Sequence, residues 1–129
     1  MKVLVLSNGE LKEKEIGTEL EDLQEIVGGY IEIPYLGDVF VNNGIDVIIN
    51  EEGKLIEGLK AEIAIVSEQR GTILDLVYGN CIFASHNAEG ETIGLTDEQI
   101  QIVNNELETV IELMNKRDLK VFEVRALFI

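Results

Sequence analysis

The residues of this chain that could do chemistry are of the types that recognise a nucleobase and its phosphates. Aromatic rings stack on bases, amide side chains bond base edges, and a guanidinium holds a phosphate through two hydrogen bonds. The candidate ligand-binding residues are Tyr30, Tyr78, Phe83 and His86 for stacking, Asn80 and Asn87 for the base edge, and Arg117 and Arg125 for phosphate. For the aromatic residues the alternative is core packing, and for the arginines it is a surface or interface salt bridge.

The few basic residues are concentrated near the end of the chain. Ten basic residues stand against 25 acidic ones, which gives a net charge of −15. From Lys116 to Ile129 there are four basic and two acidic residues, so this segment is +2 and the remainder is −17. We therefore expect any phosphate-binding potential to lie in this segment.

The sequence carries none of the common catalytic motifs. There is no P-loop, Gly-x-Gly-x-x-Gly, His-Glu-x-x-His or Gly-x-Ser-x-Gly. The single histidine, His86, excludes sites that need two, and Cys81 would face the opposite side of the same strand. We expect a binding protein that is not an enzyme and uses no cofactor and no metal. A nucleotide-processing enzyme that uses His86 is the weaker alternative.

Composition limits the class of protein. A chain of 129 residues with 46% hydrophobic residues predicts one folded domain over residues 1–129. The net charge of −15 argues against general binding to nucleic acid, whose phosphates would be repelled. The apolar run of Met1 to Leu6 is too short for a signal peptide or a membrane span, so we expect a cytoplasmic protein that does not bind a membrane.

A helix that turns sharply into a strand organises the first third of the chain. Residues 19–27 have apolar residues at helical spacing, with Thr18 as the expected N-cap. Gly28 and Gly29 can take the positive φ that ends a helix, and we expect Gly29 to need this backbone freedom. Residues 30–35 then alternate as a strand, which Pro34 places at a sheet edge or at its own end.

Further strands are predicted on both sides of this junction. Asn8-Gly9 predicts a tight hairpin between strands 2–6 and 11–16. Residues 46–50 predict a strand buried on both faces, and the turn 51–54 is interpreted mainly as a turn. Residues 58–72 fit a helix or a strand. Residues 73–85 give the best strand signal, with Gly79-Asn80 indicating a bulge or a close backbone approach.

A long helix and a final strand complete the expected fold. Thr96 and Gln99 form a capping box, and an apolar stripe predicts a helix over about 97–116 that packs across the sheet. Residues 119–129 are too apolar for a free tail, so this strand is expected either inside the sheet or between protomers. The predicted class is α+β, with a mainly antiparallel sheet packed by the long C-terminal helix and the short helix 19–27. We favour a homo-oligomer.

Several short sequence motifs together resemble a known family. These are Val27-Gly28-Gly29-Tyr30-Ile31-Glu32, then Asn50-Glu51-Glu52-Gly53-Lys54, Tyr78-Gly79-Asn80, and Leu95-Thr96-Asp97-Glu98. Over roughly residues 18–100 the chain resembles the DUF3846 family of small proteins from phages and bacterial mobile elements. The sequence departs from that pattern near residues 58–60 and has a longer C-terminal helix and strand.

The resemblance implies a phage accessory protein and gives no reaction. By analogy with small phage counter-defence factors, the leading hypothesis is a protein that sequesters an immune nucleotide signal without turnover. The ligand would be of the cyclic ADP-ribose type or a cyclic oligonucleotide. The alternative is an acidic protein-binding inhibitor, or a DNA mimic, that acts on a host defence enzyme; the charge of −15 favours it.

Overall fold

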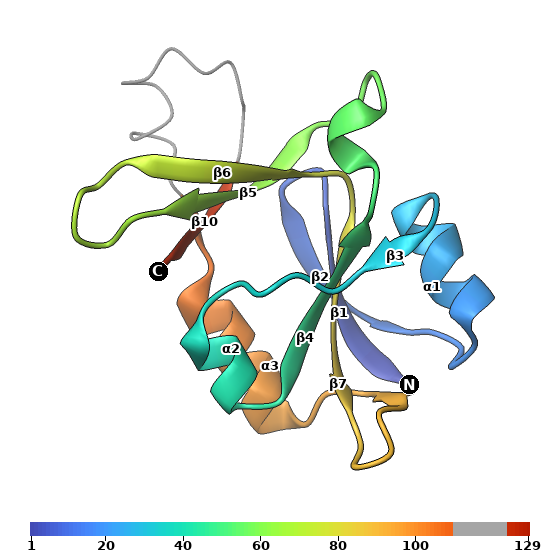
Figure 1. The fold of residues 1–129 in the computed structure, drawn as a ribbon. Coiled ribbons are helices and arrows are strands. Elements are labelled where there is room, and N and C mark those ends of the chain that lie inside the picture. The colour runs from blue at the N-terminus through green and yellow to red at the C-terminus, as the bar shows by residue number, and fades with distance from the viewer. Residues whose placement is uncertain (110–123) are drawn as a thin grey trace.

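Two β-sheets and three short helices form the part of the chain that the computed structural model describes, residues 1–109 and 124–129 (Figure 1). The strands are β1 (Lys2–Ser7), β2 (Glu10–Glu15), β3 (Ile31–Glu32), β4 (Ile45–Asn50), β5 (Ala61–Val66), β6 (Ile73–Tyr78), β7 (Cys81–His86), β8 (Thr92–Ile93), β9 (Glu108–Thr109) and β10 (Arg125–Phe128). The helices are α1 (Leu20–Val27), α2 (Asp38–Asn42) and α3 (Asp97–Glu106), with a 3₁₀ turn, η1 (Gly53–Leu55). The predicted α+β fold with one sheet under a long helix was therefore wrong.

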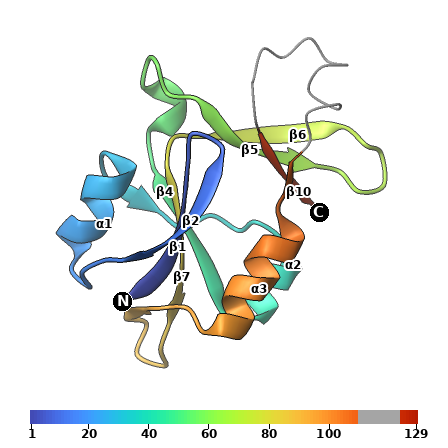
Figure 2. The same cartoon turned by 180° about the vertical axis from the view of Figure 1, so that it is seen from behind.

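The larger sheet is antiparallel and has the order β2-β1-β7-β4-β3, with β8 paired to β7. The predicted hairpin between β1 and β2 is confirmed: Asn8 and Gly9 both have positive φ, 52° and 80°, as a two-residue turn requires. Helix α1 covers one face of this sheet, where Leu23 and Val27 join a buried cluster with Val3, Val5 and Ile82. Helices α2 and α3 lie on the other side (Figures 1 and 2).

The smaller sheet has the order β6-β5-β10-β9, and its one parallel pair joins β10 to β5. The chain passes from this sheet to the larger one at Gly79, between β6 and β7, where φ is +86°. A single strand with a bulge or a close backbone approach was predicted at this point. The structure instead has a corner, and glycine suits it because the left-handed φ costs it no steric strain.

The predicted final strand is confirmed in its first form, inside a sheet. Arg125 to Phe128 pairs with Ile63 to Val66 of β5 on one side and with β9 on the other. Residues 119–123 of the prediction lie outside the described residues. Leu127 and Ala126 are buried at 2% and 0% exposure, so the strand contributes to the packing of the fold.

The main core lies between the two sheets and under α2 and α3. It contains Leu6, Phe40, Val47, Ile63, Ile65, Val77, Phe83, Val103 and Leu107. Phe40 and Phe83 meet edge to face, with ring centroids 5.9 Å apart at 69°. Strand β4 is buried on both faces as predicted, because Val47 points into this core and Ile48 into the cluster under α1.

Helix α3 is much shorter than the predicted helix 97–116. The capping box is confirmed: Thr96 Oγ1 accepts from Gln99 N at 3.1 Å, and Gln99 Oε1 accepts from Thr96 N at 2.9 Å. The helix ends at Glu106, and Leu107 is buried in extended backbone before β9 pairs with β10. Asn104-Asn105 are weak helix formers, and Glu108 and Thr109 pair with Ala126 and Arg125, so sheet pairing replaces the helix there. Residues 110–116 of the predicted helix lie outside the described residues.

The details at α1 differ from the prediction in two places. The N-cap is Glu19, whose N–H donates to Asp22 Oδ2 at 3.0 Å, in place of Thr18. The left-handed residue is Gly28, with φ of +83°, whereas Gly29 has no positive φ. Gly29 is constrained instead by space, because a Cβ there would lie 3.0 Å from Asn50 Nδ2.

A buried carboxylate, Glu62, joins the two sheets. It is the extra residue of a bulge in β5, since Ala61 pairs with Tyr78 and Ile63 with Val77. Its oxygens accept from Asn8 N at 2.7 Å and Gly9 N at 2.9 Å in the β1–β2 turn, and the residue is 3% exposed. Both donors would be left without this partner if the carboxylate were removed.

We expect Glu62→Gln to destabilise the protein. The glutamine oxygen can accept from one backbone N–H of the turn, but its NH₂ group would face the other N–H, and two donors cannot bond each other. The loss should be about 1.5–3 kcal/mol, the scale of a hydrogen bond to a charged group. Urea unfolding measures it, with Glu89→Gln as the control that removes one exposed charge. Equal stability of the two variants would show that the hydrogen bonds of Glu62 to the β1–β2 turn contribute nothing.

Candidate functional site

Three of the short sequence motifs, residues 27–32, 50–54 and 78–80, meet at the carboxyl end of α1. Asn50 Nδ2 donates to Val27 O and Asn80 Nδ2 donates to Ile26 O, both at 3.0 Å. Glu51 N donates to Tyr30 O at 2.9 Å. The last carbonyls of a helix have no partner within the helix, so these two amides satisfy them and hold the helix end against β4 and β7.

Asn50 is the central residue of this junction. It is 4% exposed, and besides its bond to Val27 O it accepts from Glu52 N at 2.8 Å through Oδ1. A Cβ at Gly29 would lie 3.0 Å from Asn50 Nδ2, so a side chain at that position would press against the amide. The amide therefore fixes the direction in which residues 51–54 leave the sheet.

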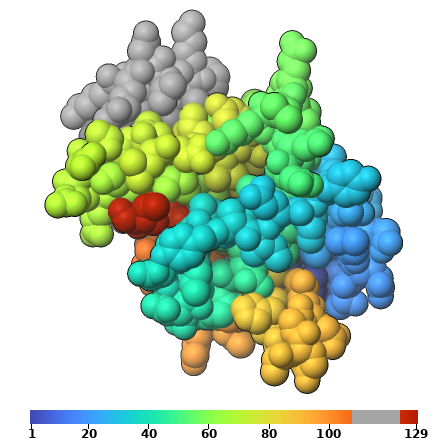
Figure 3. Space-filling view, viewed as in Figure 1, coloured from blue at the N-terminus to red at the C-terminus, as the bar shows by residue number. Residues whose placement is uncertain are grey.

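Gly53 places η1 directly against β6. A Cβ at this position would lie 2.6 Å from the carbonyl oxygen of Tyr78, which is closer than real Cβ atoms come. Only glycine therefore allows the backbone of η1 to approach β6 so closely. In Figure 3 the green segment around η1 projects from the body of the molecule above the segment that carries β3.

Two adjacent clefts lie around this junction. The first, which we call the β3–β6 cleft, has a volume of about 230 Å³ and lies among β3, the end of β4, η1 and β6. The second, the α1 cleft, has a volume of about 430 Å³ and lies between α1, Gly29-Tyr30 and Ile56. Asn50 and Glu52 line both clefts, so the junction forms the wall between them.

The clefts combine acidic residues with apolar surface. Six carboxylates line the two clefts: Glu21, Glu25, Glu32, Glu51, Glu52 and Asp75. Among the described residues of the linings, Lys54 is the one basic side chain. Leu36, Ile65 and Val77 form a buried floor in the β3–β6 cleft, while Tyr30 and Leu55 beside it are 71% and 83% exposed.

An ion pair crosses the β3–β6 cleft. Lys54 Nζ of η1 donates to Asp75 Oδ1 of β6 at 2.5 Å, and both side chains are more than half exposed. The hydrogen bond from Lys54 lowers the pKa of Asp75 below its ordinary value, helped by a bond from Leu76 N at 2.8 Å. Asp75 is therefore a carboxylate at neutral pH.

The predicted ligand-binding residues do not form one site. Tyr30 and Tyr78 line the clefts, and the Asn80 amide is bonded to the end of α1. His86 and Asn87 lie at the far end of β7, about 17 Å from Cys81 at the usual rise of a strand.

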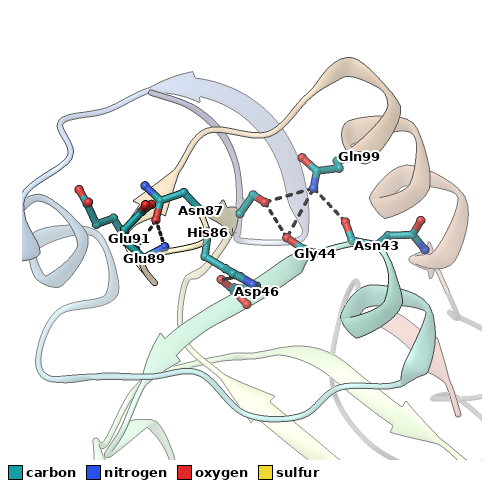
Figure 4. A network of polar contacts seen from close by, with 9 residues as sticks. Asn43, Gly44, Asp46, His86, Asn87, Glu89, Glu91 and Gln99 are labelled. Carbon is teal, nitrogen blue, oxygen red and sulfur yellow. Dashed lines mark hydrogen bonds and ion pairs between the residues drawn. The ribbon is translucent and has the colours of Figure 1, made fainter.

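A separate polar network occupies that far end (Figure 4). His86 Nδ1 lies 2.9 Å from Asp46 Oδ2, and Asn87 Oδ1 accepts from Glu89 N and Glu91 N, which shapes the following turn. Gln99 Nε2 donates to Asn43 O at 2.9 Å and to Ser85 Oγ at 3.2 Å. These contacts join α3, the β4 entry and β7, so most of the polar groups here are engaged within the fold.

The remaining predicted residues are spread through the fold. Phe83 is fully buried against Phe40, which is the core packing that was the alternative for each aromatic residue. Arg125 is half-buried in β10 and lines neither cleft, and Arg117 lies outside the described residues.

The lone cysteine is a core residue. Cys81 has 0% exposure, and burial, with the negative charge of Glu62, raises its pKa to about 12. The thiol is therefore protonated and enclosed at neutral pH, as a small apolar residue would be.

The sequence analysis selected aromatic and cationic residues as ligand-binding candidates and missed the acidic clefts. Glu51, Glu52 and Lys54 were interpreted mainly as a turn, and Asp75 as part of a strand. The available signal was that the motifs at residues 27–32 and 50–54 contain Glu32, Glu51 and Glu52 as well as glycines. The pairing of β3 with β4 and the corner at Gly79 determine which motifs meet in space, and the sequence does not reveal these two features.

The comparisons with known proteins give one match. Residues 1–108 match the domain of unknown function DUF3846, so the chain belongs to this family. No curated protein and no solved structure matches the chain. The matched range includes both clefts and all the residues that line them.

The described residues contain no group of metal ligands and no helix that could span a membrane. Within residues 1–109 and 124–129, no three His, Cys, Asp or Glu side chains are grouped as metal ligands would be. None of the described helices has the length and apolar character needed to cross a bilayer.

We expect Asn50→Asp to destabilise the protein, because a carboxylate would replace the donor that faces Val27 O at the negative end of α1. The loss should be about 1–3 kcal/mol, the cost of an unsatisfied buried group, and chemical unfolding measures it. The control is Asn105→Asp, an exposed position near the end of α3. If both variants lose the same stability, the amide of Asn50 does not hold the junction together.

Proposed function

We propose that this protein binds another protein through its acidic clefts, which take a cationic segment of the partner. The observation that carries the proposal is that residues 27–32, 50–54 and 78–80 converge on two clefts lined by six carboxylates. This is the acidic inhibitor of the sequence analysis with a defined surface, and a basic, DNA-binding host defence enzyme is the kind of partner it fits.

Local charge supports a cationic ligand over an anionic one. The carboxylates of Glu32, Glu51 and Glu52 have no ion-pair partner among the described residues, and Lys54 is already paired with Asp75. Like charges gathered in one cleft repel each other, so a cation that enters relieves this repulsion as well as forming new contacts.

The exposed apolar side chains support a macromolecular partner. Tyr30, Ile33 and Tyr35 are 71%, 50% and 62% exposed, and Leu55 and Ile56 are 83% and 40% exposed. Interfaces place aromatic and aliphatic anchors beside charged residues, and tyrosine is enriched among the residues that contribute most. The exposed residues from Tyr30 to Tyr35 and at η1 are suited to that role.

We expect a fluorescein-labelled peptide of alternating arginine and leucine to bind the protein, and to bind less tightly as salt rises, because charge drives the contact. Replacing Glu51 and Glu52 by Gln should weaken binding by about tenfold, the factor for one charged hydrogen bond. Fluorescence anisotropy measures the affinity.

The matched control replaces Glu89 and Glu91 by Gln, which removes the same charge from the turn at the far end of β7. This pair should change affinity little. No binding of the peptide by the parent would remove the proposal. Equal losses in the two double variants would indicate charge recognised over the whole surface, as in a DNA mimic.

Sequestration of a nucleotide signal is the second candidate. Tyr30 supports it, because this tyrosine lines the α1 cleft, whose volume of about 430 Å³ falls within the usual range of small-molecule pockets, about 300–1,000 Å³. The phosphates of such a nucleotide would need Arg117 and Arg125 to bind them. Phage origin, homo-oligomer formation and a cytoplasmic location stay predictions of the sequence.

We expect Arg117→Ala and Arg125→Ala each to weaken binding of such a signal by about ten- to a hundredfold if the tail holds the phosphates. Calorimetry with a panel of cyclic ADP-ribose-type and cyclic oligonucleotide ligands tests this, with melting temperatures from the same samples. A parent protein that binds none of them excludes this candidate and leaves the cationic-peptide proposal in place.

A further inference from the structure

The contact between Lys54 and Asp75 shows what kind of group the β3–β6 cleft accepts. An ammonium on an aliphatic stem reaches from η1 across the cleft to a carboxylate on β6, with an N···O distance of 2.5 Å. The chain thus places one of its own cations in a cleft that is otherwise lined by acidic and apolar residues.

This internal cation is held weakly and leaves negative charge behind. The side chains of Lys54 and Asp75 are 59% and 55% exposed, and an exposed ion pair contributes about 0–1 kcal/mol. Glu32, Glu51 and Glu52 line the same cleft, and none of them has an ion-pair partner in the described part of the chain. A second cation is therefore favoured there, and Lys54 can be displaced at little cost.

The size of the cleft suits a single side chain. Its volume of about 230 Å³ lies below the usual range of small-molecule pockets, about 300–1,000 Å³. Leu55 and Leu76 line it and can contact an aliphatic stem, and four carboxylates line the same cleft.

We propose that the β3–β6 cleft binds a single arginine side chain of the partner, whose guanidinium takes the position of the Lys54 ammonium on Asp75. This rests on the proposed function and specifies its ligand. Arginine is favoured over lysine because the planar guanidinium presents five donors and can bond two carboxylates at once, whereas an ammonium acts as a point charge. Lys54 is then an internal competitor that lowers the affinity for every such ligand.

The first test measures binding of the alternating arginine–leucine peptide to Lys54→Met. We expect tighter binding by roughly two- to fivefold, the factor that corresponds to an exposed ion pair. Lys12→Met is the matched control, because Lys12 is paired with Glu10 at 2.8 Å and the two side chains are 64% and 63% exposed. It lies on β2, so it should change affinity little at a salt concentration that screens distant charges.

The second test asks whether one arginine and one carboxylate account for recognition. Replacing the peptide arginines one at a time by neutral citrulline should give one position with a loss of about tenfold and small losses elsewhere. Asp75→Asn, made in the Lys54→Met protein, should lower affinity by a similar factor and should abolish the difference between those positions.

The outcomes separate this inference from the proposed function. If the parent does not bind the peptide, the proposed function fails. If the parent binds and Lys54→Met binds equally or more weakly, while its melting temperature is unchanged, Lys54 is no competitor and the inference is overturned. Equal losses at every citrulline position would also overturn it, since the peptide would then be bound by diffuse charge.

Discussion

The amide of Asn50 is the interaction on which the rest of the candidate site depends. One side chain satisfies a terminal carbonyl of α1, accepts from the backbone of Glu52 and meets Gly29 at close range. A buried amide can do this only when both of its polar ends are bonded, because an unpaired group would be costly. The positions of α1, of Tyr30 and of η1 are thereby coupled, and the two clefts lie on either side of the residue that couples them.

The second constraint is the way the two sheets are joined. The chain turns from one sheet into the other at Gly79, and Glu62 links the sheets again through the β1–β2 turn. These links bring β6 beside η1, so that Asp75 and Lys54, which are 21 residues apart, meet across a cleft. The acidic surface is thus produced by topology, and its carboxylates come from α1, β3, the turn after β4 and β6.

Local patterns predicted several elements but not the fold class, and long-range pairing explains what they missed. The Asn8-Gly9 hairpin, the capping box at Thr96 and the buried strand β4 depend on neighbouring residues, and the structure confirms them. The long helix failed because residues after Glu106 pair with β10, a contact that helical periodicity does not contain. The candidate site shows the same limit: Asn80 was predicted as a ligand group, whereas its amide is bonded to a carbonyl 54 residues away.

The proposal that residues 27–32, 50–54 and 78–80 form one binding surface is tested most directly by amide chemical-shift mapping by NMR. The labelled protein is titrated with the arginine–leucine peptide, and the shifts are located along the chain. The account predicts that the largest changes fall in residues 28–34, 50–56 and 74–78, on the walls of the two clefts. Changes confined to β2 or to the turn after β7, with these three segments unaffected, would contradict it.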